Sequence, residues 1–445
     1  MNNFKRKNNV ITVPFFLSAL LIIIVLFRGI INNLIGYGTA MVDAVIYIMI
    51  IYFVFNAKPF YKNKKQIFIV KLYFIWFFLC ALTLCMQVIF GKTQIYSGFL
   101  GFRNDVIYTF PFIFCLFFLK RKEIPKIIKV FCLSGVLICM FGIVQYLGRN
   151  YLPEILLSPK GENTFGLYGT DIIRANGLCG NTIIFSGLCI IVLSFSWAIV
   201  IKSKYHSKFG WFSFVISIVA NLLTFSRASF VGMALVIVLE YLLSICWNEK
   251  SDVFKKILYL FLAIGVSIFV VFTFFKDSTI IQRLLDKDSI WNTGSDEGHF
   301  STILNAIKTI KSNFWFGYGF GTVGYSSDAS KPIIADGTFW TYLLEWGFPN
   351  VIIYSIFILQ AVKLAIKYKS SSNFLCASLS LAFIGINFYL ILFSIINSAY
   401  SARCNLILNF MILGCLMKYC SSKENKAQGA LLNIKKKSLI IYKVP

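Results

Sequence analysis

Long apolar runs, separated by short polar segments, extend from residue 11 to residue 420. A helix of about 20 apolar residues is long enough to cross a bilayer. The runs do not alternate between apolar and polar positions, as the strands of a transmembrane barrel would. The pattern therefore predicts an all-α polytopic membrane protein with about twelve transmembrane helices. The predicted spans are residues 11–27, 33–56, 67–91, 105–119, 127–148, 182–201, 209–226, 229–247, 257–275, 347–366, 374–397 and 406–420.

Residues 276–337 form the longest interruption of this pattern and contain one of only two histidines in the chain. No long polar linker and no internal repeat divides the sequence. We therefore interpret residues 1–445 as a single integral membrane domain that holds this large extracytoplasmic loop. The basic segment 1–10 precedes the first run without a small-residue cleavage site, which predicts an uncleaved first span. The basic segment 421–445 is interpreted as a cytoplasmic tail on the anionic inner leaflet.

Lysine and arginine residues gather on one side of this predicted topology. With the N-terminus inside, the inner segments carry 28 Lys and Arg and 4 Asp and Glu, whereas the outer segments carry 14 and 12. Almost the whole net charge of +25 thus falls on the inner side, which is the positive-inside pattern. The pattern predicts that both termini are cytoplasmic. It also explains the basicity without the nucleic acid that such a charge would suggest for a soluble protein.

Composition supports the same class of protein. Charged residues make up 14% of the chain, against about 25% in soluble domains. The 12 cysteines lie mostly inside apolar runs and form no CxxC pair, so we interpret them as small core residues rather than a metal site or a disulfide framework. Cys179 and Cys404 both fall near the outer face, where they either pair or remain unrelated thiols. Asp43 and Glu240 fall within spans, as proton-relay groups or as partners in interhelical hydrogen bonds.

Within the long loop, apolar residues recur at helical spacing between His299 and Asn313. A helix with one apolar stripe beside a membrane is expected to lie along the interface, which would present His299 at the membrane surface. The alternative is a loop helix with a solvated first turn. The stripe consists of Phe300, Ile303, Leu304, Ile307 and Ile310.

A run of spaced glycines, GYGFGTVG, follows this helix at residues 317–324. Spaced glycines allow backbone N–H groups to approach an anion closely, so Gly319 and Gly321 are candidate substrate-binding positions. No strand precedes the run, so it is not a dinucleotide fingerprint. The alternative is a tight turn between two interfacial helices.

Residues 336–347, DGTFWTYLLEWG, are predicted to form a further helix that leads into the next span. Asp336 lies at its start. Glu345 falls near the outer interface, where a carboxylate is costly unless it is paired or functional.

Five of the arginines on the predicted outer face are candidate site residues. Guanidinium groups match phosphate oxygens two at a time, so arginines at the mouth of a helical bundle suit a pyrophosphate. The alternative is an ion pair with a nearby carboxylate, or snorkelling to lipid headgroups. The five are Arg103, Arg174, Arg227, Arg283 and Arg403.

Several of these segments resemble, in the same order, those of the O-antigen polymerase/ligase superfamily of bacterial envelope polysaccharides. Residues 223–232, LTFSRASFVG, are similar to its T-x-S-R element. Residues 297–324 are similar to its late extracytoplasmic loop, where a helix precedes a G-x-G-x-G turn. Residues 336–354 are similar to its helix that ends in E-x-G, and residues 101–110, GFRNDVIYTF, to an earlier RN element.

The resemblance implies a GT-C-like helical fold and a glycosyltransferase of the bacterial cytoplasmic (inner) membrane. Such an enzyme joins sugar units carried on undecaprenyl pyrophosphate at the outer face of that membrane. Arg227, with Arg103 and Arg283, would neutralise the pyrophosphate. His299 would orient or deprotonate the acceptor hydroxyl, with Glu345 and Asp336 as rivals. Arg174, Arg403, Gly319 and Gly321 complete the expected substrate-binding set.

The expected function is that of a Wzy-like polymerase of surface polysaccharide, such as lipopolysaccharide O-antigen or capsule. The expected partners are the undecaprenyl-pyrophosphate-linked oligosaccharide, membrane lipids and a chain-length regulator, with no nucleic acid and no cofactor. We expect no metal, because arginines already face the leaving group, although Asp296 and Glu297 stand close by. One alternative is an O-antigen ligase that transfers the glycan to lipid A core. An alternative of another class is a flippase or transporter, but internal repeats are absent and polar midplane residues are few.

Overall fold

The computed structural model describes residues 12–57, 64–157, 174–245, 294–323, 337–397, 400 and 402–420. These residues are almost entirely helical and include no strand, so the prediction of an all-α fold is confirmed. The elements are α1 (Val13–Ile35), α2 (Gly38–Asn56), α3 (Lys64–Ile89), α4 (Ile95–Asp105), η1 (Ile107–Thr109), α5 (Pro111–Phe118), α6 (Ile124–Leu147), η2 (Glu154–Leu156), α7 (Thr182–Lys202), α8 (Lys208–Leu222), α9 (Arg227–Ile245), α13 (Gly294–Ser312), α14 (Thr338–Trp346), α15 (Phe348–Tyr368), α16 (Phe374–Phe393) and a last helix at 403–420.

Nine helical segments in the described part of the chain are long and apolar enough to cross a membrane. One of them, Ile95–Phe118, joins α4, η1 and α5. The shorter α8 and the last helix match two further predicted spans. The predicted span 257–275 lies outside the described residues.

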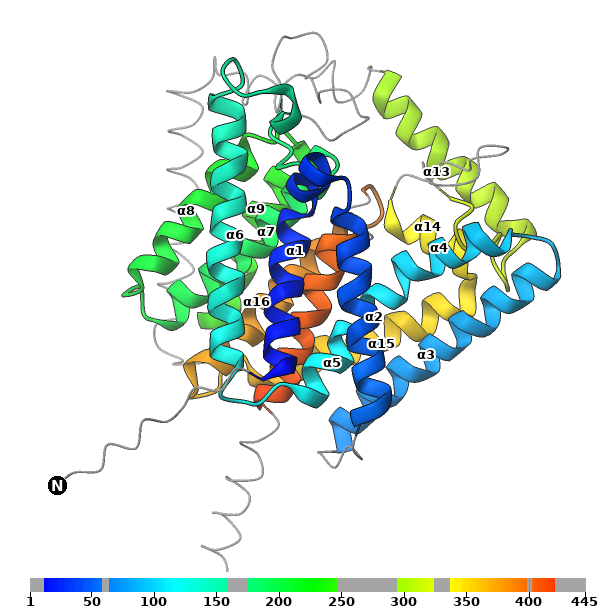
Figure 1. The fold of residues 1–445 in the computed structure, drawn as a ribbon, viewed down its shortest axis with the longest axis horizontal. Helices are drawn as coiled ribbons and strands as arrows, with labels where there is room; N and C mark the ends of the chain where they lie inside the picture. The colour runs from blue at the N-terminus through cyan, green and yellow to red at the C-terminus, as the bar shows by residue number, and fades with distance from the viewer. Residues whose placement is uncertain are drawn as a thin grey trace, which may run out of the picture.

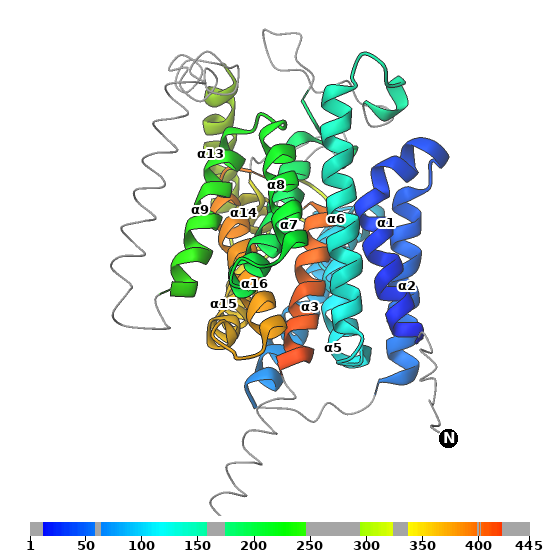
Figure 2. The same ribbon diagram turned by 90° about the vertical axis from the view of Figure 1, so that its left-hand side faces the viewer.

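Helix α7 lies at the centre of the bundle and packs against α6, α8, α9 and α16 (Figures 1 and 2). Of its membrane window 83% is buried, compared with 28% for α2, which is exposed at the edge of the bundle. The interior is polar in places. The side-chain amides of Asn387 and Asn409 donate to each other at 3.0 Å in both directions, which joins α16 to the last helix. Ser194 donates to Glu240, which is the predicted interhelical hydrogen bond.

The two ends of the bundle differ in charge. We call the end where α1 stops and α9 starts the arginine end, because Arg28, Arg103, Arg174, Arg227 and Arg403 lie there. At the opposite end α1 begins, and lysines gather there beside the ends of α3, α7 and α15. This separation of charge is the one on which the predicted topology rests; the orientation in the membrane remains a prediction.

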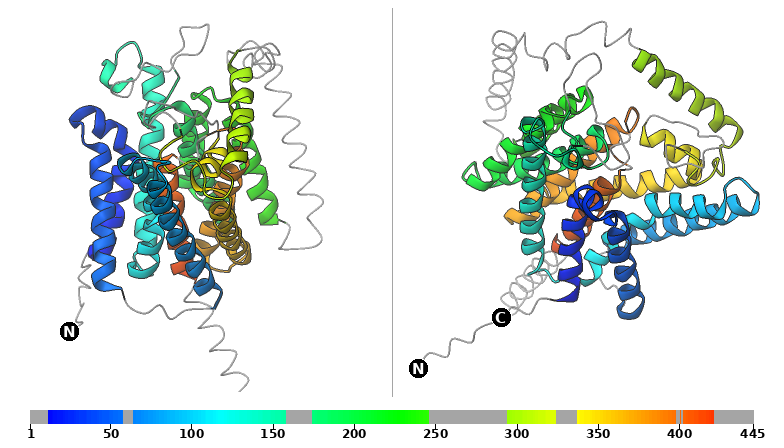
Figure 3. Two further views of the ribbon diagram at one scale, coloured as in Figure 1. Left: turned by 90° about the vertical axis from the view of Figure 1, so that its right-hand side faces the viewer. Right: turned by 45° about the horizontal axis from the view of Figure 1, so that its top comes forward.

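Helix α13 lies beside the arginine end, to one side of the bundle (Figure 3). It packs against α14 through Ala306, which is fully buried, and Ile310, which contact a small cluster with Val323, Trp340 and Leu344. The two loop helices that the sequence predicted, at 299–313 and 336–347, are thus confirmed, although α13 extends back to Gly294. Part of the predicted apolar stripe does not pack inward, because Leu304 is 45% exposed.

Residues 28–32 were predicted to separate the first span from the second, but they are helical in the structure. Helix α1 continues through this segment to Ile35 and ends at Gly36, whose φ of 81° places it in the left-handed region that favours glycine. The polar residues that suggested a turn find partners across the bundle. For example, the Asn33 side chain donates to the carbonyl of Ile155 at 2.6 Å.

The fourth span, predicted at 105–119, begins earlier in the structure, within residues 92–104. Most of them form α4, which pairs with the end of α3 and continues through η1 into α5 (Figure 1). Gly98 and Gly101 allow this helix to pack closely. The helical path is broken after Asp105, which is where its polar residues gather.

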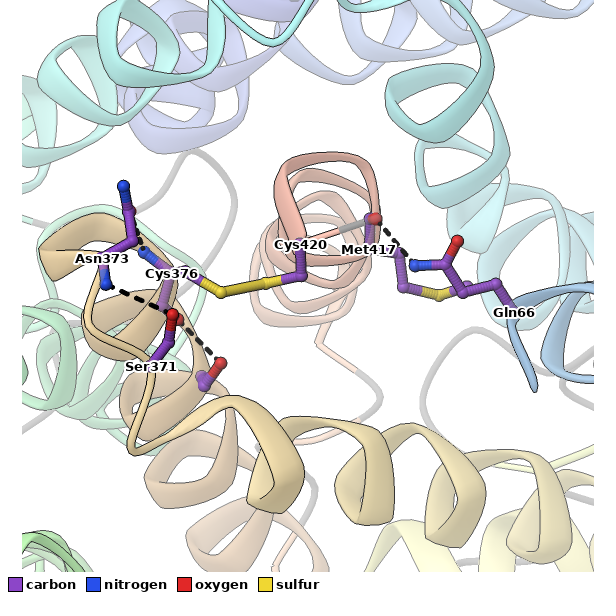
Figure 4. Close-up of a disulfide and its surroundings, with 7 residues drawn as sticks. Gln66, Ser371, Asn373, Cys376, Met417 and Cys420 are labelled. Atoms are coloured by element: carbon purple, nitrogen blue, oxygen red, sulfur yellow. Dashed lines mark hydrogen bonds between the residues drawn. A yellow bond between two sulfur atoms is a disulfide. The ribbon is translucent and has the colours of Figure 1, made fainter. Parts of the chain in front are cut away.

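The cysteines include one bonded pair, at two positions that the sequence analysis interpreted as small core residues. Cys376 at the start of α16 and Cys420 at the end of the last helix form a disulfide at the opposite end of the bundle (Figure 4). Two antiparallel neighbouring helices bring these residues together across 44 positions, which sequence spacing did not reveal. Cys179 and Cys404 remain free and buried, as one of the two alternatives anticipated.

Candidate functional site

Arginines from three separate helices interact with one another at the arginine end, and one of them pairs with a carboxylate. Arg103 forms an ion pair with Asp43 of α2, with Nη1 and Oδ2 3.0 Å apart and each side chain 15% exposed. Tyr108 donates its hydroxyl to the other oxygen of Asp43 at 2.5 Å, and the Arg103 guanidinium lies 5.8 Å from the Tyr108 ring centroid. Arg28 and Arg403 complete the group, which we call the Asp43 cluster.

Arg403 interacts electrostatically with the other members of this cluster. It interacts with Tyr108 and Asp43, and also with the like charges of Arg28 and Arg103. Arg403 also interacts with Asp105, so the three guanidinium groups outnumber the two carboxyl groups near them and leave an excess of positive charge. A partly buried excess of positive charge favours an anionic ligand, because the like charges otherwise repel one another in a medium of low dielectric.

Arg174 and Arg227 lie at a second position of the arginine end, the turn between α8 and α9. Arg174 donates from Nε to the carbonyl of Thr224 at 2.7 Å, and the next residue, Ala175, donates its backbone N–H to Leu223 at 3.0 Å. Arg227 is the first residue of α9. The structure thus brings the segment of Arg174 to the turn that carries Arg227.

Residues 174–179 connect the two positions. Arg28 donates from Nη2 to the carbonyl of Cys179 at 3.3 Å, five residues after Arg174. Four of the five predicted arginines therefore lie on the same end of the bundle. Arg283 lies outside the described residues.

The glycine run forms a tight turn whose backbone groups are used by protein partners. Gln87 at the end of α3 donates to the carbonyl of Phe316 at 2.6 Å and accepts from the N–H of Phe320 at 2.9 Å. Gly321 has a φ of 68°, and a Cβ there would lie 2.0 Å from the carbonyl oxygen of Ser97 in α4. These contacts agree with the alternative interpretation of the glycine run, a tight turn between two helices. An anion-binding role for Gly319 and Gly321 remains a prediction.

Glu345 lies beneath this turn, 3% exposed, and not at an open surface. Its Oε1 accepts from the N–H of Val323 at 3.2 Å, and it shares a hydrogen bond with Asp105 at the end of α4. Asp105 also accepts from the indole of Trp346 at 3.2 Å. Burial, followed by repulsion from Asp105 and the hydrogen bond with it, raises the pKa of Glu345 well above its usual range. The neutral carboxyl group therefore donates to Asp105.

A comparison with known families matches one segment of the chain. Residues 212–355 match the family described as O-antigen ligase (Wzy_C). The matched segment is a member of the O-antigen polymerase/ligase superfamily. It runs from α8 into α15, and so it contains the turn of Arg227, α13, the glycine turn and Glu345. No curated protein matches the chain.

The match of residues 212–355 to this family implies an enzyme of the glycosyl-transfer type, a polymerase or a ligase. The superfamily also suggests lipid-linked oligosaccharide substrates and a membrane setting, which agrees with the apolar helices of this multi-pass protein. The match does not distinguish the two reactions.

The matched segment also holds the predicted residues whose side chains lie outside the described part of the chain. His299 is on α13, and of its side chain, as of Asp336, the structure describes nothing. Conversely, sequence reasoning missed Arg28 and Gln87 as members of the site. Arg28 carried a signal, an arginine at the end of an apolar run, but it was assigned to a turn. Gln87 is a single polar residue near the end of a span, and nothing in the pattern singled it out.

Proposed function

We propose that this protein is a polymerase of bacterial surface polysaccharide. It transfers a glycan chain from a polyprenyl pyrophosphate onto the sugar of a second undecaprenyl-pyrophosphate-linked repeat unit. The reaction takes place at the outer face of the cytoplasmic membrane, at the arginine end of the bundle. Both termini then lie in the cytoplasm, in agreement with the positive-inside distribution of charge.

The observation that carries the proposal is the Asp43 cluster. A pyrophosphate brings several negative charges and pairs of oxygens that match the planar fork of a guanidinium group. Arg28, Arg103 and Arg403 outnumber the carboxyl groups of Asp43 and Asp105, so positive charge remains in excess. Preorganised positive groups stabilise the charge that develops on a departing pyrophosphate, and in a partly buried site this effect is larger than in water.

An apolar groove near the cluster suits the isoprenoid part of such a substrate. Its volume is about 270 Å³, and α14, α15 and α16 form its walls. Tyr400 closes one side and hydrogen-bonds through its hydroxyl to Tyr354. Since Tyr400 is three residues before Arg403, a lipid chain in the groove would place its pyrophosphate toward the arginines.

In the proposed reaction the acceptor hydroxyl oxygen forms a bond to the anomeric carbon of the donor sugar. The bond between that carbon and the pyrophosphate oxygen breaks, and polyprenyl pyrophosphate leaves with the electron pair. His299 on α13 accepts the hydroxyl proton, with Asp336 as the alternative base. Arg227 and Arg283, together with Arg103, Arg174 and Arg403, neutralise the leaving group.

The second candidate is an O-antigen ligase, because that is the description of the matched family. The glycan of a strain that lacks the gene separates the two. A polymerase is supported when only single repeat units reach the surface. A ligase is supported when long lipid-linked chains accumulate and never reach lipid A core, and unchanged chains on the surface would refute both.

A further inference from the structure

We propose that Glu345 is a positioning residue, which joins the turn after α13 to the helix that carries Arg103. The inference rests on the proposed function, because it concerns the same site. The sequence analysis named Glu345 as a candidate general base, and the present proposal gives it a different role.

The contacts of Glu345 are all with the protein. Two backbone N–H groups, those of Gly321 and Val323, reach its carboxyl group, with the second at 3.2 Å from Oε1. Its remaining interaction is the hydrogen bond to Asp105. A general base must reach the hydroxyl that it deprotonates, and a side chain that is 3% exposed and engaged in this way is poorly placed to do so.

Gln87 supports the same arrangement from α3. Its amide nitrogen donates to the backbone carbonyls of Glu345, at 2.7 Å, and of Phe316, at 2.6 Å. Its oxygen accepts from Phe320 at 2.9 Å, and Thr93 donates to the carbonyl of Phe320 at 2.9 Å. The end of α3, the turn after α13 and the end of α14 are therefore held as one unit.

This unit connects the two groups to which the proposed function gives chemical roles. Asp105 follows Arg103 by two residues on α4, and the indole of Trp346 holds it from the other side. The turn at 316–323 follows directly on α13, which carries His299. A shift of Glu345 would thus move the backbone at both places, and misplacement of reacting groups by about 1 Å can cost about 10²-fold in rate.

Glutamine can reproduce every contact of a neutral Glu345. Its oxygen accepts from Val323 and its amide donates to Asp105. Burial and Asp105 raise the pKa of Glu345, which keeps the native carboxyl group in the protonated form that glutamine imitates. Leucine has a similar volume but leaves two buried N–H groups and Asp105 without their partner.

The experiment compares E345Q and E345L in the full-length protein, with transfer measured on a lipid-pyrophosphate-linked repeat unit. We expect E345Q to keep kcat within about twofold, with an unchanged pH–rate profile, and E345L to lose at least about tenfold in kcat. A loss of about 10²-fold or more in E345Q, or a lost limb of its pH–rate profile, would show that Glu345 is the base and overturn the proposal. A fully active E345L would overturn it as well.

Glu240 provides the matched control. It is another fully buried glutamate, bonded to Ser194, and lies 13 residues along α9 from Arg227, or about 20 Å at 1.5 Å per residue. E240Q and E240L report the general cost of altering a buried carboxyl group, and we expect both to keep the wild-type kcat per folded molecule.

Thermal unfolding in detergent adds a readout that does not depend on the reaction. E345Q is expected to unfold at the wild-type temperature, and E345L at a lower one; equal losses in both variants would contradict the proposed contacts. If E345L does not fold, the kcat and the pH–rate profile of E345Q still test whether Glu345 is a positioning residue or the base. If the wild-type protein transfers no glycan, the proposed function fails while this comparison still tests the contacts of Glu345.

Discussion

Asp43 pairs with Arg103, so under the proposed function it would compete with an anionic substrate for that guanidinium group. Asp43→Asn removes its negative charge but keeps an oxygen that can accept from Tyr108 or Arg103. We therefore expect this substitution to tighten the binding of pyrophosphate. An ion pair with a purely structural role predicts the reverse, because its loss leaves Arg103 without a counter-charge beside Arg28 and Arg403.

The expected magnitude follows from the geometry of the ion pair. Arg103 and Asp43 are 3.0 Å apart, so a phosphate on the far side of the guanidinium group would lie about 6–8 Å from Asp43. At an effective dielectric constant of about 20, one unit of charge at that distance contributes about 2–3 kcal/mol of repulsion. Both side chains are 15% exposed, and salt screens over about 8 Å, so about 1–2 kcal/mol should remain. That corresponds to a dissociation constant about 5- to 30-fold lower.

Calorimetric titration of the detergent-purified protein with inorganic pyrophosphate measures this change. R103A should weaken binding, and the double substitution D43N/R103A, which restores the original charge of the cluster, should recover most of that loss. E240Q, which changes a buried carboxyl group on α9, should bind as the wild type does. The reasoning is refuted if D43N is folded, as judged by size-exclusion chromatography, and binds pyrophosphate equally or more weakly.

Three further predictions concern the loop and the α8–α9 turn. R227A should abolish long polysaccharide chains in cells while the protein still inserts and single repeat units still reach the surface. Normal polysaccharide chain lengths would show that Arg227 is not needed for the reaction. H299A should lower the transfer rate by about 10²–10⁴ if His299 is the base, and a change of less than twofold would move that role to Asp336. G321A should destabilise the protein by more than about 3 kcal/mol, because its Cβ would meet Ser97 at 2.0 Å, whereas G91A, with a similar φ of 66° and open space around it, should cost only about 1 kcal/mol. Thermal unfolding of the two glycine variants checks this difference, and equal losses would contradict the close packing of the turn.

The helices could be predicted from the sequence because their cause is local. A helix satisfies its own backbone hydrogen bonds, so an apolar run of sufficient length defines a span without reference to the rest of the fold. The boundaries were less certain where polar residues approach a span end. Arg28 looked like part of a turn, and only the carbonyl of Cys179, 151 residues later, shows how α1 accommodates it.

The site was harder to predict than the spans, since its contacts join distant segments. Arg103 and Arg403 were correctly placed on one face, but nothing in the sequence shows that Asp43, which lies in another span, pairs with Arg103. The same holds for Glu345, whose partners lie on α4 and in the glycine turn. A carboxylate at an interface suggested chemistry, whereas its burial and its bonded neighbours give it a structural explanation that only the three-dimensional arrangement supplies.

The reciprocal amide pair of Asn387 and Asn409 has a consequence at the arginine end. Hydrocarbon offers no substitute partner for either amide, so the pair selects a single rotational setting of the last helix against α16. A slip of one residue would turn that helix by about 100° and sever both bonds. The same slip would also move Arg403, which lies less than two helical turns from Asn409, away from Arg28 and Arg103. The uncharged Asn387–Asn409 pair in the membrane interior thereby fixes the direction in which the charged side chain of Arg403 points at the end of the bundle.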